Sequence, residues 1–152
     1  MSEIFTIGYE GATQPNVLDA LEAAGVGLVI DERAIAASRR AGFSKTVLSN
    51  SLAERGIGYA HLRSLGTPKP GRDAARRGDI AELHRIFDAH MHTPEAADGL
   101  ERAIALAGGD RPVCLLCFEH TPEGCHRLPV AERIAARTGQ TISHLAPARP
   151  LG

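Results

Sequence analysis

The sequence predicts an α/β fold, a three-layer α/β/α sandwich around a mainly parallel, doubly wound (Rossmann-like) sheet of about five strands. The first observation is that short apolar runs alternate along the chain with stretches whose apolar residues recur at helical spacing. The second is that a helix separates each predicted strand from the next, which is how parallel neighbours are connected. The 152 residues suffice for one domain with its own core, and we find no repeat or linker, so residues 1–152 are taken as one unit.

Each element rests on its own pattern. The apolar runs predict strands at residues 4–7, 27–30, 57–60, 113–117 and 141–145. Helices are predicted after the candidate N-caps Thr13 and Ser44, over residues 80–90, after Pro94, and from Leu128 to Gly139. The segment 65–72 is rich in glycine and proline, so we expect a loop there, with residues 66–72 as a mobile lid.

Polar side chains follow the predicted strands. Parallel strands joined by right-handed crossovers have all their carboxyl ends on one rim, where α/β proteins usually bind ligands. In a doubly wound sheet the first and fourth strands are neighbours at the switch point. The rim is therefore expected to gather residues 8–11, residues 31–33, His61, the loop through Arg72, and residues 117–127.

The charge is unevenly distributed. The net charge is −1, but residues 33–77 hold ten basic and two acidic residues and so carry +8. This basicity favours an anionic partner, either a phosphate- or nucleotide-like small molecule or a nucleic acid. The alternative is that these cations pair with acids elsewhere. No apolar run approaches the roughly 20 residues of a membrane span, and no signal-like segment precedes residue 4, so we expect a cytoplasmic protein without a membrane partner.

Five sets of motifs stand out: residues 6–10, Asp31 with Arg33, residues 38–40 with 42–45, residues 56–62 with 65–66, and residues 116–119 with 125–127. They resemble the domain-of-unknown-function family 488, a group of bacterial and archaeal proteins of compact α/β fold. The resemblance spans nearly the whole chain and supports the fold and the rim site, while the family's description implies no activity. Glu32 stands where the family usually has an apolar residue, and Ala41 where a proline is often found.

The first candidate chemistry uses carboxylates. Glu10 and Glu119 are expected to face each other across the switch point, with Asp31 one strand away. Two carboxyls in a partly desolvated cleft can hold different pKa values, so that one serves as an acid and the other as a base or nucleophile. The alternative is that Glu119 forms a structural ion pair with Arg127 or Arg33.

The second candidate chemistry uses Cys117, Cys125 and His126. Thiolates and imidazole bind zinc, but the two cysteines are eight positions apart without a Cys-x-x-Cys pair, so we predict no metal site. Cys117 alone could be a nucleophile, although the phosphatase pattern needs an arginine at position 123, which is Glu123. Three clustered cysteines also predict no disulfide framework.

The hypothesis that follows is a small enzyme, a hydrolase or transferase, that acts on a phosphorylated or nucleotide-like substrate. Its alternatives are a non-catalytic nucleotide or nucleic-acid binding module and a zinc- or thiol-dependent enzyme. No phosphate-binding glycine motif is present, and the sequence indicates no cofactor and no oligomeric state. The expected catalytic residues are Glu119, Glu10 and Cys117, and the expected binding residues are Gly8, Tyr9, Asp31, Arg33, Arg40, His61, Lys69, Arg72, Cys125, His126 and Arg127.

Overall fold

The computed structural model describes residues 2–120, 122 and 126–149. Within this part of the chain, no helix is both long enough and apolar enough to cross a bilayer. The elements in chain order are β1 (Glu3–Gly8), α1 (Gln14–Ala23), β2 (Leu28–Asp31), α2 (Lys45–Glu54), β3 (Gly58–His61), η1 (Arg63–Leu65), α3 (Lys69–Arg76), α4 (Ile80–His90), α5 (Pro94–Ala107), β4 (Val113–Cys117), α6 (Arg127–Thr138) and β5 (Thr141–Leu145).

The predicted fold class is confirmed. The five strands form one sheet in the order β3-β2-β4-β1-β5, and every neighbouring pair is parallel. β4 lies at the centre, and all five of its residues are buried. Its uninterrupted apolar sequence is therefore what a strand covered on both faces requires.

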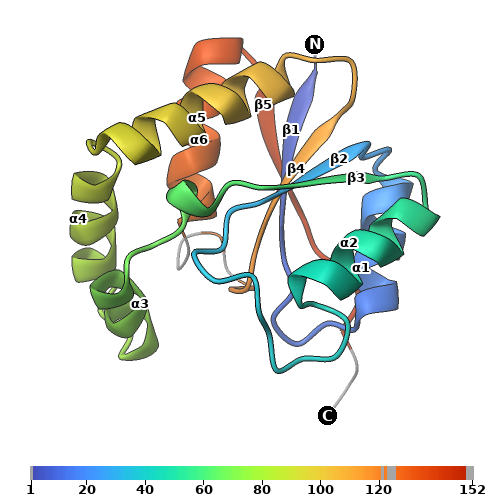
Figure 1. The fold of residues 1–152 in the computed structure, drawn as a ribbon, viewed down its shortest axis with the longest axis horizontal. Helices are drawn as coiled ribbons and strands as arrows, with labels where there is room; N and C mark the ends of the chain where they lie inside the picture. Colours follow the sequence, from blue (N-terminus) through green and yellow to red (C-terminus); the bar gives the residue numbers. More distant parts are fainter. Residues whose placement is uncertain (1, 121, 123–125, 150–152) are drawn as a thin grey trace.

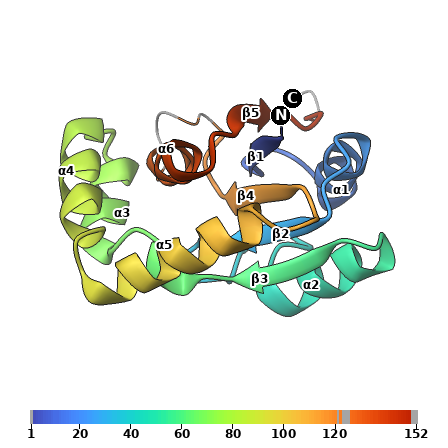
Figure 2. The ribbon, with the colours of Figure 1, turned by 90° about the horizontal axis from the view of Figure 1, so that it is seen from above.

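Helices cover both faces of the sheet (Figures 1 and 2). Because side chains alternate along β4, Leu116 joins the apolar cluster beneath α1 and α2, while Leu115 joins the cluster beneath α5 and α6. Seen from above, α3 and α4 stand further out on the side of α5 and α6 (Figure 2). The three layers are thus α1 and α2, the sheet, and α5 and α6.

The predicted helix starts are largely correct. The Thr13 hydroxyl accepts a hydrogen bond from the Asn16 amide, which satisfies one free N–H at the start of α1. Ser44 precedes α2 as predicted, but its hydroxyl bonds to the backbone of Ser38 instead of capping the helix. α1 is followed by Gly25 with φ +76°, a left-handed conformation in which a Cβ would be strained.

The prediction of a loop over residues 65–72 is wrong, because α3 begins at Lys69. Pro70 lies in the first turn, where the missing N–H would have no helical partner anyway. Gly71 is buried inside α3, where a Cβ would collide with the Thr67 side chain. The glycine and prolines therefore fit a helix, and the proposed lid over residues 66–72 is in part a regular element.

The switch point lies where the sequence placed it. β1 and β4 pair in parallel, and β1 leads to α1 on one face while β4 leads to α6 on the other. The pairing continues past both strand ends, since the Tyr9 amide donates to the Cys117 carbonyl at 3.2 Å and the Glu10 amide donates to the Phe118 carbonyl at 2.8 Å. The chain segments after β1 and β4 are thus held side by side at the carboxyl edge of the sheet.

Candidate functional site

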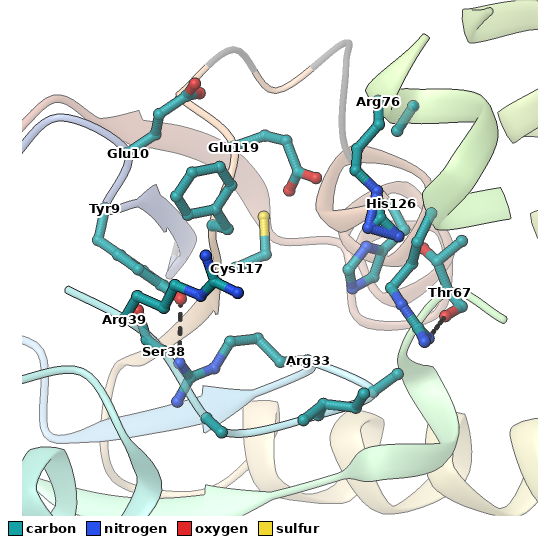
Figure 3. Close-up of a pocket in the computed structure, with 16 residues that line it drawn as sticks. Tyr9, Glu10, Arg33, Ser38, Arg39, Thr67, Arg76, Cys117, Glu119 and His126 are labelled. Carbon is teal, nitrogen blue, oxygen red and sulfur yellow. Dashed lines mark hydrogen bonds between the residues drawn. The ribbon is translucent and has the colours of Figure 1, made fainter. Parts of the chain in front are cut away.

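One cavity of about 1010 Å³ opens at the carboxyl edge of the sheet, and we call it the rim cavity (Figure 3). Its volume is at the upper end of what small-molecule sites need. The ends of β1, β2 and β4 contribute to it, together with α3 and the start of α6. It is lined by Tyr9, Glu10, Arg33, Ala34, Ile35, Ala37, Ser38, Arg39, Thr67, Arg72, Ala75, Arg76, Cys117, Phe118, Glu119 and His126.

The topology brings part of the predicted site together. Of the predicted residues, those that line the rim cavity are Tyr9, Glu10, Arg33, Arg72, Cys117, Glu119 and His126. Six other predicted residues are described but do not line it: Gly8, Asp31, Arg40, His61, Lys69 and Arg127. Cys125 lies outside the described residues.

Asp31 and Arg33 form a buried ion pair at the end of β2. The Arg33 Nε and Nη2 atoms donate to the two Asp31 carboxylate oxygens at 2.8 and 2.7 Å, and the Tyr59 hydroxyl donates to Asp31 at 2.5 Å. Burial disfavours the charged guanidinium, but the hydrogen bonds and charge of Asp31 outweigh it and raise the pKa of Arg33. Burial, together with the hydrogen bond to Asp31, raises the pKa of Tyr59.

Arg33 also positions Tyr9. Its Nη1 atom donates to the Tyr9 hydroxyl at 3.1 Å and to the Phe43 carbonyl at 2.7 Å. The Tyr9 ring stacks on Phe43 with centroids 4.3 Å apart, and it meets Phe118 edge to face at 5.4 Å. With four side-chain hydrogen bonds made inside the protein, Arg33 acts mainly as a support for this wall of the cavity and less as the predicted anion ligand.

Arg127 likewise serves the protein interior. Its exposed fraction is 1%, and its guanidinium donates to the Thr6 hydroxyl at 3.2 Å, to the carbonyl of Glu119, and to the carbonyl of His120 at 3.0 Å. Gly8 lies directly beside it, where a Cβ would overlap the Glu119 carbonyl and the guanidinium. Its Nη1 atom also donates to the Cys117 sulfur at 3.3 Å, so Arg127 fixes the segment after β4 to β1 from behind and does not itself line the rim cavity.

Glu119 is the carboxyl that points into the rim cavity. Its side chain is half-buried and points toward the part of the cavity where Arg76 and His126 lie (Figure 3). Burial, with the charge of Glu10, raises the pKa of Glu119, while Arg127 opposes the rise. Glu119 is thus set up to hold a proton at a higher pH than an ordinary glutamate does.

Glu10 is more exposed than Glu119. One of its carboxylate oxygens accepts a hydrogen bond from the His120 amide at 2.9 Å, and the side chain points away from the other labelled side chains in Figure 3. The two carboxyls therefore belong to one site. They do not face each other directly, although the switch-point argument had expected that they would. The main effect of Glu10 on Glu119 is electrostatic.

His126 lines the rim cavity, and the buried Glu32 lies behind it. Both carboxyl oxygens of Glu32 are buried and have no hydrogen-bond partner within the described residues, and the nearest approach to His126 Nε2 is 3.9 Å. Burial raises the pKa of Glu32 well above its usual range, although the charge of Arg127 works against the rise. Burial lowers the pKa of His126 to about 4, and its Nε2 atom lies 2.9 Å from the Glu32 carbonyl. The His126 ring is therefore neutral at pH 7, so it forms no ion pair with the Glu32 carboxyl.

Cys117 ends β4 and is buried in the floor of the rim cavity. Its sulfur takes part in a disulfide bond, which the odd number of cysteines did not predict. In this form the sulfur is no nucleophile until the bond is reduced. Cys114 is a free, buried thiol whose pKa burial raises, which makes it an inert core residue. Among residues 2–120, 122 and 126–149, no three metal-binding side chains gather at one point.

Three other predicted binding residues bond elsewhere. The Arg40 guanidinium donates to the Ala12 carbonyl, and Arg40 lines a separate hollow near the start of α1. The His61 ring bonds to the Arg33 carbonyl at 2.7 Å. Lys69 is exposed and pairs with Asp73 at 3.0 Å.

The sequence reasoning missed several cavity residues. Arg39 is exposed and makes no hydrogen bond or ion pair with another described residue; its side chain points into the cavity toward Cys117 (Figure 3). Arg76 was missed because residues 65–72 were expected to form a loop, which hid the helical spacing of Arg72 and Arg76. The apolar lining residues Ile35 and Phe118 are 61% and 42% exposed, and the sequence gave no signal for them beyond their position after a strand.

The fold and the site define the class: a doubly wound parallel α/β protein with a ligand-sized cavity at the carboxyl edge of its sheet. The family model described as "Domain of unknown function DUF488" matches residues 13–134, so the chain belongs to this family, as its motifs had indicated. No curated protein and no solved structure matches the chain.

Proposed function

We propose that this protein is an enzyme, a hydrolase or transferase, that acts on a phosphorylated or nucleotide-like small molecule in the rim cavity. Glu119 is the residue that moves protons, and Glu10 tunes it. Arg39, Arg72 and Arg76 bind the anionic group of the substrate. The observation that carries the proposal is a half-buried carboxyl of raised pKa that points into a cavity also lined by arginines.

Glu119 has the properties of a general acid. A carboxyl that keeps its proton to higher pH can donate it to a leaving oxygen or nitrogen near neutrality, and the resulting carboxylate can then take a proton from the attacking group. Glu10 favours the protonated form of Glu119 through its negative charge. An anionic substrate group beside Glu119 would raise its pKa further, so substrate binding would prepare the acid for its step.

The arginines of the cavity favour a small anion over a polymer. Outside the cavity, much of the basic segment is already neutralised, since Arg55 pairs with Asp19 and Glu22, Lys69 pairs with Asp73, and Arg77 lies 3.8 Å from Asp79. At the cavity, Arg39 has no protein partner among the described residues, Arg72 donates to the Thr67 carbonyl at 2.8 Å, and Arg76 pairs with Asp73 at 2.8 Å. Arg39 therefore brings to the cavity a positive charge that no acidic side chain of the described residues neutralises.

The test is a turnover screen of nucleosides, nucleotides and sugar phosphates with the unmodified protein and Glu119→Gln. Glutamine keeps the shape of the side chain but carries no transferable proton, so kcat should fall by about 10²- to 10⁴-fold, while KM changes little. The matched control is Glu132→Gln, an exposed glutamate of α6 outside the rim cavity, which should keep full activity. Activity that survives Glu119→Gln unchanged would remove this residue from the mechanism.

Two alternatives remain as outcomes of direct measurements. A nucleic-acid binding module would bind DNA or RNA at low salt and lose affinity steeply as salt rises, because binding releases counterions. A zinc-dependent enzyme would retain about one zinc per chain through purification, and a thiol-dependent enzyme would need reduction of the Cys117 disulfide before it turned over substrate.

A further inference from the structure

Exposed apolar side chains gather at the rim cavity. In the described part of the chain the large hydrophobic residues that are exposed are Ile35, Val47, Ile80 and Phe118. Two of these four, Ile35 and Phe118, line the rim cavity. Exposed apolar side chains inside a cavity mark a place where a ligand buries apolar surface of its own.

Phe118 packs against a second aromatic ring despite its exposure. Its ring meets Tyr9 edge to face, at a centroid distance of 5.4 Å and an interplanar angle of 78°. Tyr9 is itself fixed, because it stacks on Phe43 at 4.3 Å and receives a hydrogen bond from Arg33. The exposed part of the Phe118 ring offers an aromatic surface at the cavity on which a flat group can pack.

The arginines proposed to bind the anion come from other segments than the aromatic residues Tyr9 and Phe118. Arg39 follows β2, and Arg72 and Arg76 lie on consecutive turns of α3. Arg76 shares its charge with Asp73 at 2.8 Å, whereas Arg39 has no partner within the described residues. A ligand that satisfies the whole cavity therefore needs a flat apolar part and a separate anionic part.

We infer that the substrate of the rim cavity is a nucleotide and not a sugar phosphate, with its base packed against Phe118 and Ile35 and its phosphate bound by Arg39. Arg72 and Arg76 contribute positive charge to the same phosphate site. This inference rests on the proposed function and names the substrate class of that site. A sugar phosphate would fill the cationic part and leave Phe118 and Ile35 exposed to water.

The test compares ligands that carry the two parts separately. Isothermal titration calorimetry at one fixed ionic strength measures the binding of AMP and UMP, of adenosine and uridine, and of ribose 5-phosphate. Each ligand is titrated into the unmodified protein, Phe118→Leu and Arg39→Gln. Leucine keeps an apolar side chain but removes the ring, and glutamine removes the charge.

At least one of the two nucleotides should bind more tightly than its nucleoside and than ribose 5-phosphate. Phe118→Leu should weaken that nucleotide and its nucleoside about tenfold, as expected for the loss of one stacking partner, and leave ribose 5-phosphate unchanged. Arg39→Gln should weaken the nucleotide and ribose 5-phosphate about tenfold and leave the nucleoside unchanged.

Two control variants lie outside the cavity. Val47→Ala removes an exposed apolar side chain of α2, and Arg102→Gln removes an exposed arginine of α5; neither should change any affinity. The inference is overturned if neither nucleotide binds more tightly than ribose 5-phosphate, or if Phe118→Leu weakens ribose 5-phosphate as much as the nucleotide.

Two results separate a wrong nucleotide assignment from a wrong proposal that the protein is an enzyme. Turnover of a ringless sugar phosphate that depends on Glu119 would refute the nucleotide assignment and keep the enzyme. Nucleotide binding with the expected dependence on Phe118 and Arg39, but without any turnover, would keep the assignment and refute the enzyme.

Discussion

Asp31 and Glu32 are neighbours at the end of β2, and both are fully buried, yet their surroundings are opposite in kind. The Asp31 carboxylate accepts hydrogen bonds from the side chain and amide of Arg33 and from the Tyr59 hydroxyl. The two carboxyl oxygens of Glu32 have no hydrogen-bond partner in the described part of the chain. Two adjacent acids with equal burial thus differ in their hydrogen bonds. We call the Asp31 network the saturated side and the surroundings of the Glu32 carboxyl the empty side.

The difference arises from strand geometry. Successive side chains of an extended segment point to opposite faces of a sheet. Asp31 meets Arg33, which holds Tyr9 and Phe43 of the α1–α2 core, whereas Glu32 approaches His126, whose ring packs against Phe87 of the other core at 5.5 Å. Burial alone therefore does not decide which hydrogen bonds a carboxyl makes; the side chains on its face of the sheet decide it.

The largest effect is expected from breaking the saturated side. Asp31→Leu leaves the Arg33 guanidinium buried without its counter-charge, which should lower the free energy of unfolding by about 3–5 kcal/mol. Urea denaturation at pH 7 measures the loss. In the double variant Asp31→Leu/Arg33→Met no charge stays buried, so the loss should be smaller than in the single variant. An equal or larger loss would mean that the ion pair is not the stabilising part of this network.

The second effect is a pH dependence of the free energy of unfolding, which arises at His126 beside Glu32. Burial lowers the pKa of His126 to about 4 in the folded protein, whereas an unfolded histidine titrates near 6.5. Between these values the unfolded chain binds more protons, so stability is lost as the pH falls from 6.5 to 4, by up to about 1.4 kcal/mol per pH unit and about 3 kcal/mol in all.

His126→Gln removes this titration, so its free energy of unfolding should depend less on pH than that of the unmodified protein between pH 6.5 and 4. The control is His90→Gln, which replaces a half-buried ring whose Nε2 atom also bonds to a backbone carbonyl, that of Ser64 at 2.6 Å. Equal slopes for the unmodified protein and His126→Gln would show that His126 takes up its proton in the folded state as easily as in the unfolded one.

The third effect comes from filling the empty side. Glu32→Leu removes a buried carboxyl that has no hydrogen-bond partner among the described residues, so it should raise the free energy of unfolding at pH 7 by about 2 kcal/mol. The folded pKa of Glu32 is raised above the unfolded value of 4.5, so above that pH the folded chain binds more protons and stability falls as pH rises. The gain from leucine should therefore grow as the pH rises above 4.5.

Glu32→Gln separates ionisation from packing. It cannot ionise, so it should share the weaker pH dependence of the leucine variant, but its buried amide still needs partners, and its gain at pH 5 should be close to zero. Destabilisation by Glu32→Leu at every pH would mean that a bound water or ligand satisfies the carboxyl.

The sequence predicted the elements better than it predicted side-chain partners. The uninterrupted apolar run from Val113 to Cys117 is the pattern of a central strand that is buried on both faces. The strand, the parallel sheet and the switch point could therefore be predicted from the sequence. α3 was missed because helix breakers are tolerated in a first turn, and the fit of Gly71 against Thr67 is a tertiary contact.

The candidate site was predictable only in part. Topology placed Glu119, Glu10 and Cys117 at one edge of the sheet without any knowledge of side-chain directions. It did not show that Arg127 turns inward to Thr6, 121 positions away, or that Arg33 binds Asp31. Arg39, which the sequence reasoning did not select, is left to face the cavity. Which arginine stays available depends on packing partners far away in the chain, and a single sequence does not reveal them.

The smallest effect is expected from removing one bond on the saturated side. Tyr59→Phe deletes only the hydroxyl that donates to Asp31 at 2.5 Å, and Arg33 still supplies three hydrogen bonds to the same carboxylate. Because Tyr59 is half-buried, water can replace part of the lost contact, so the free energy of unfolding should fall by about 1 kcal/mol. Urea denaturation measures this loss, once alone and once in the Asp31→Leu background. With the acceptor gone, the Tyr59 hydroxyl has nothing to bond there, so the second loss should vanish. A loss of equal size in both backgrounds would show that Tyr59 stabilises the protein by packing, and that the Asp31 network ends at Arg33.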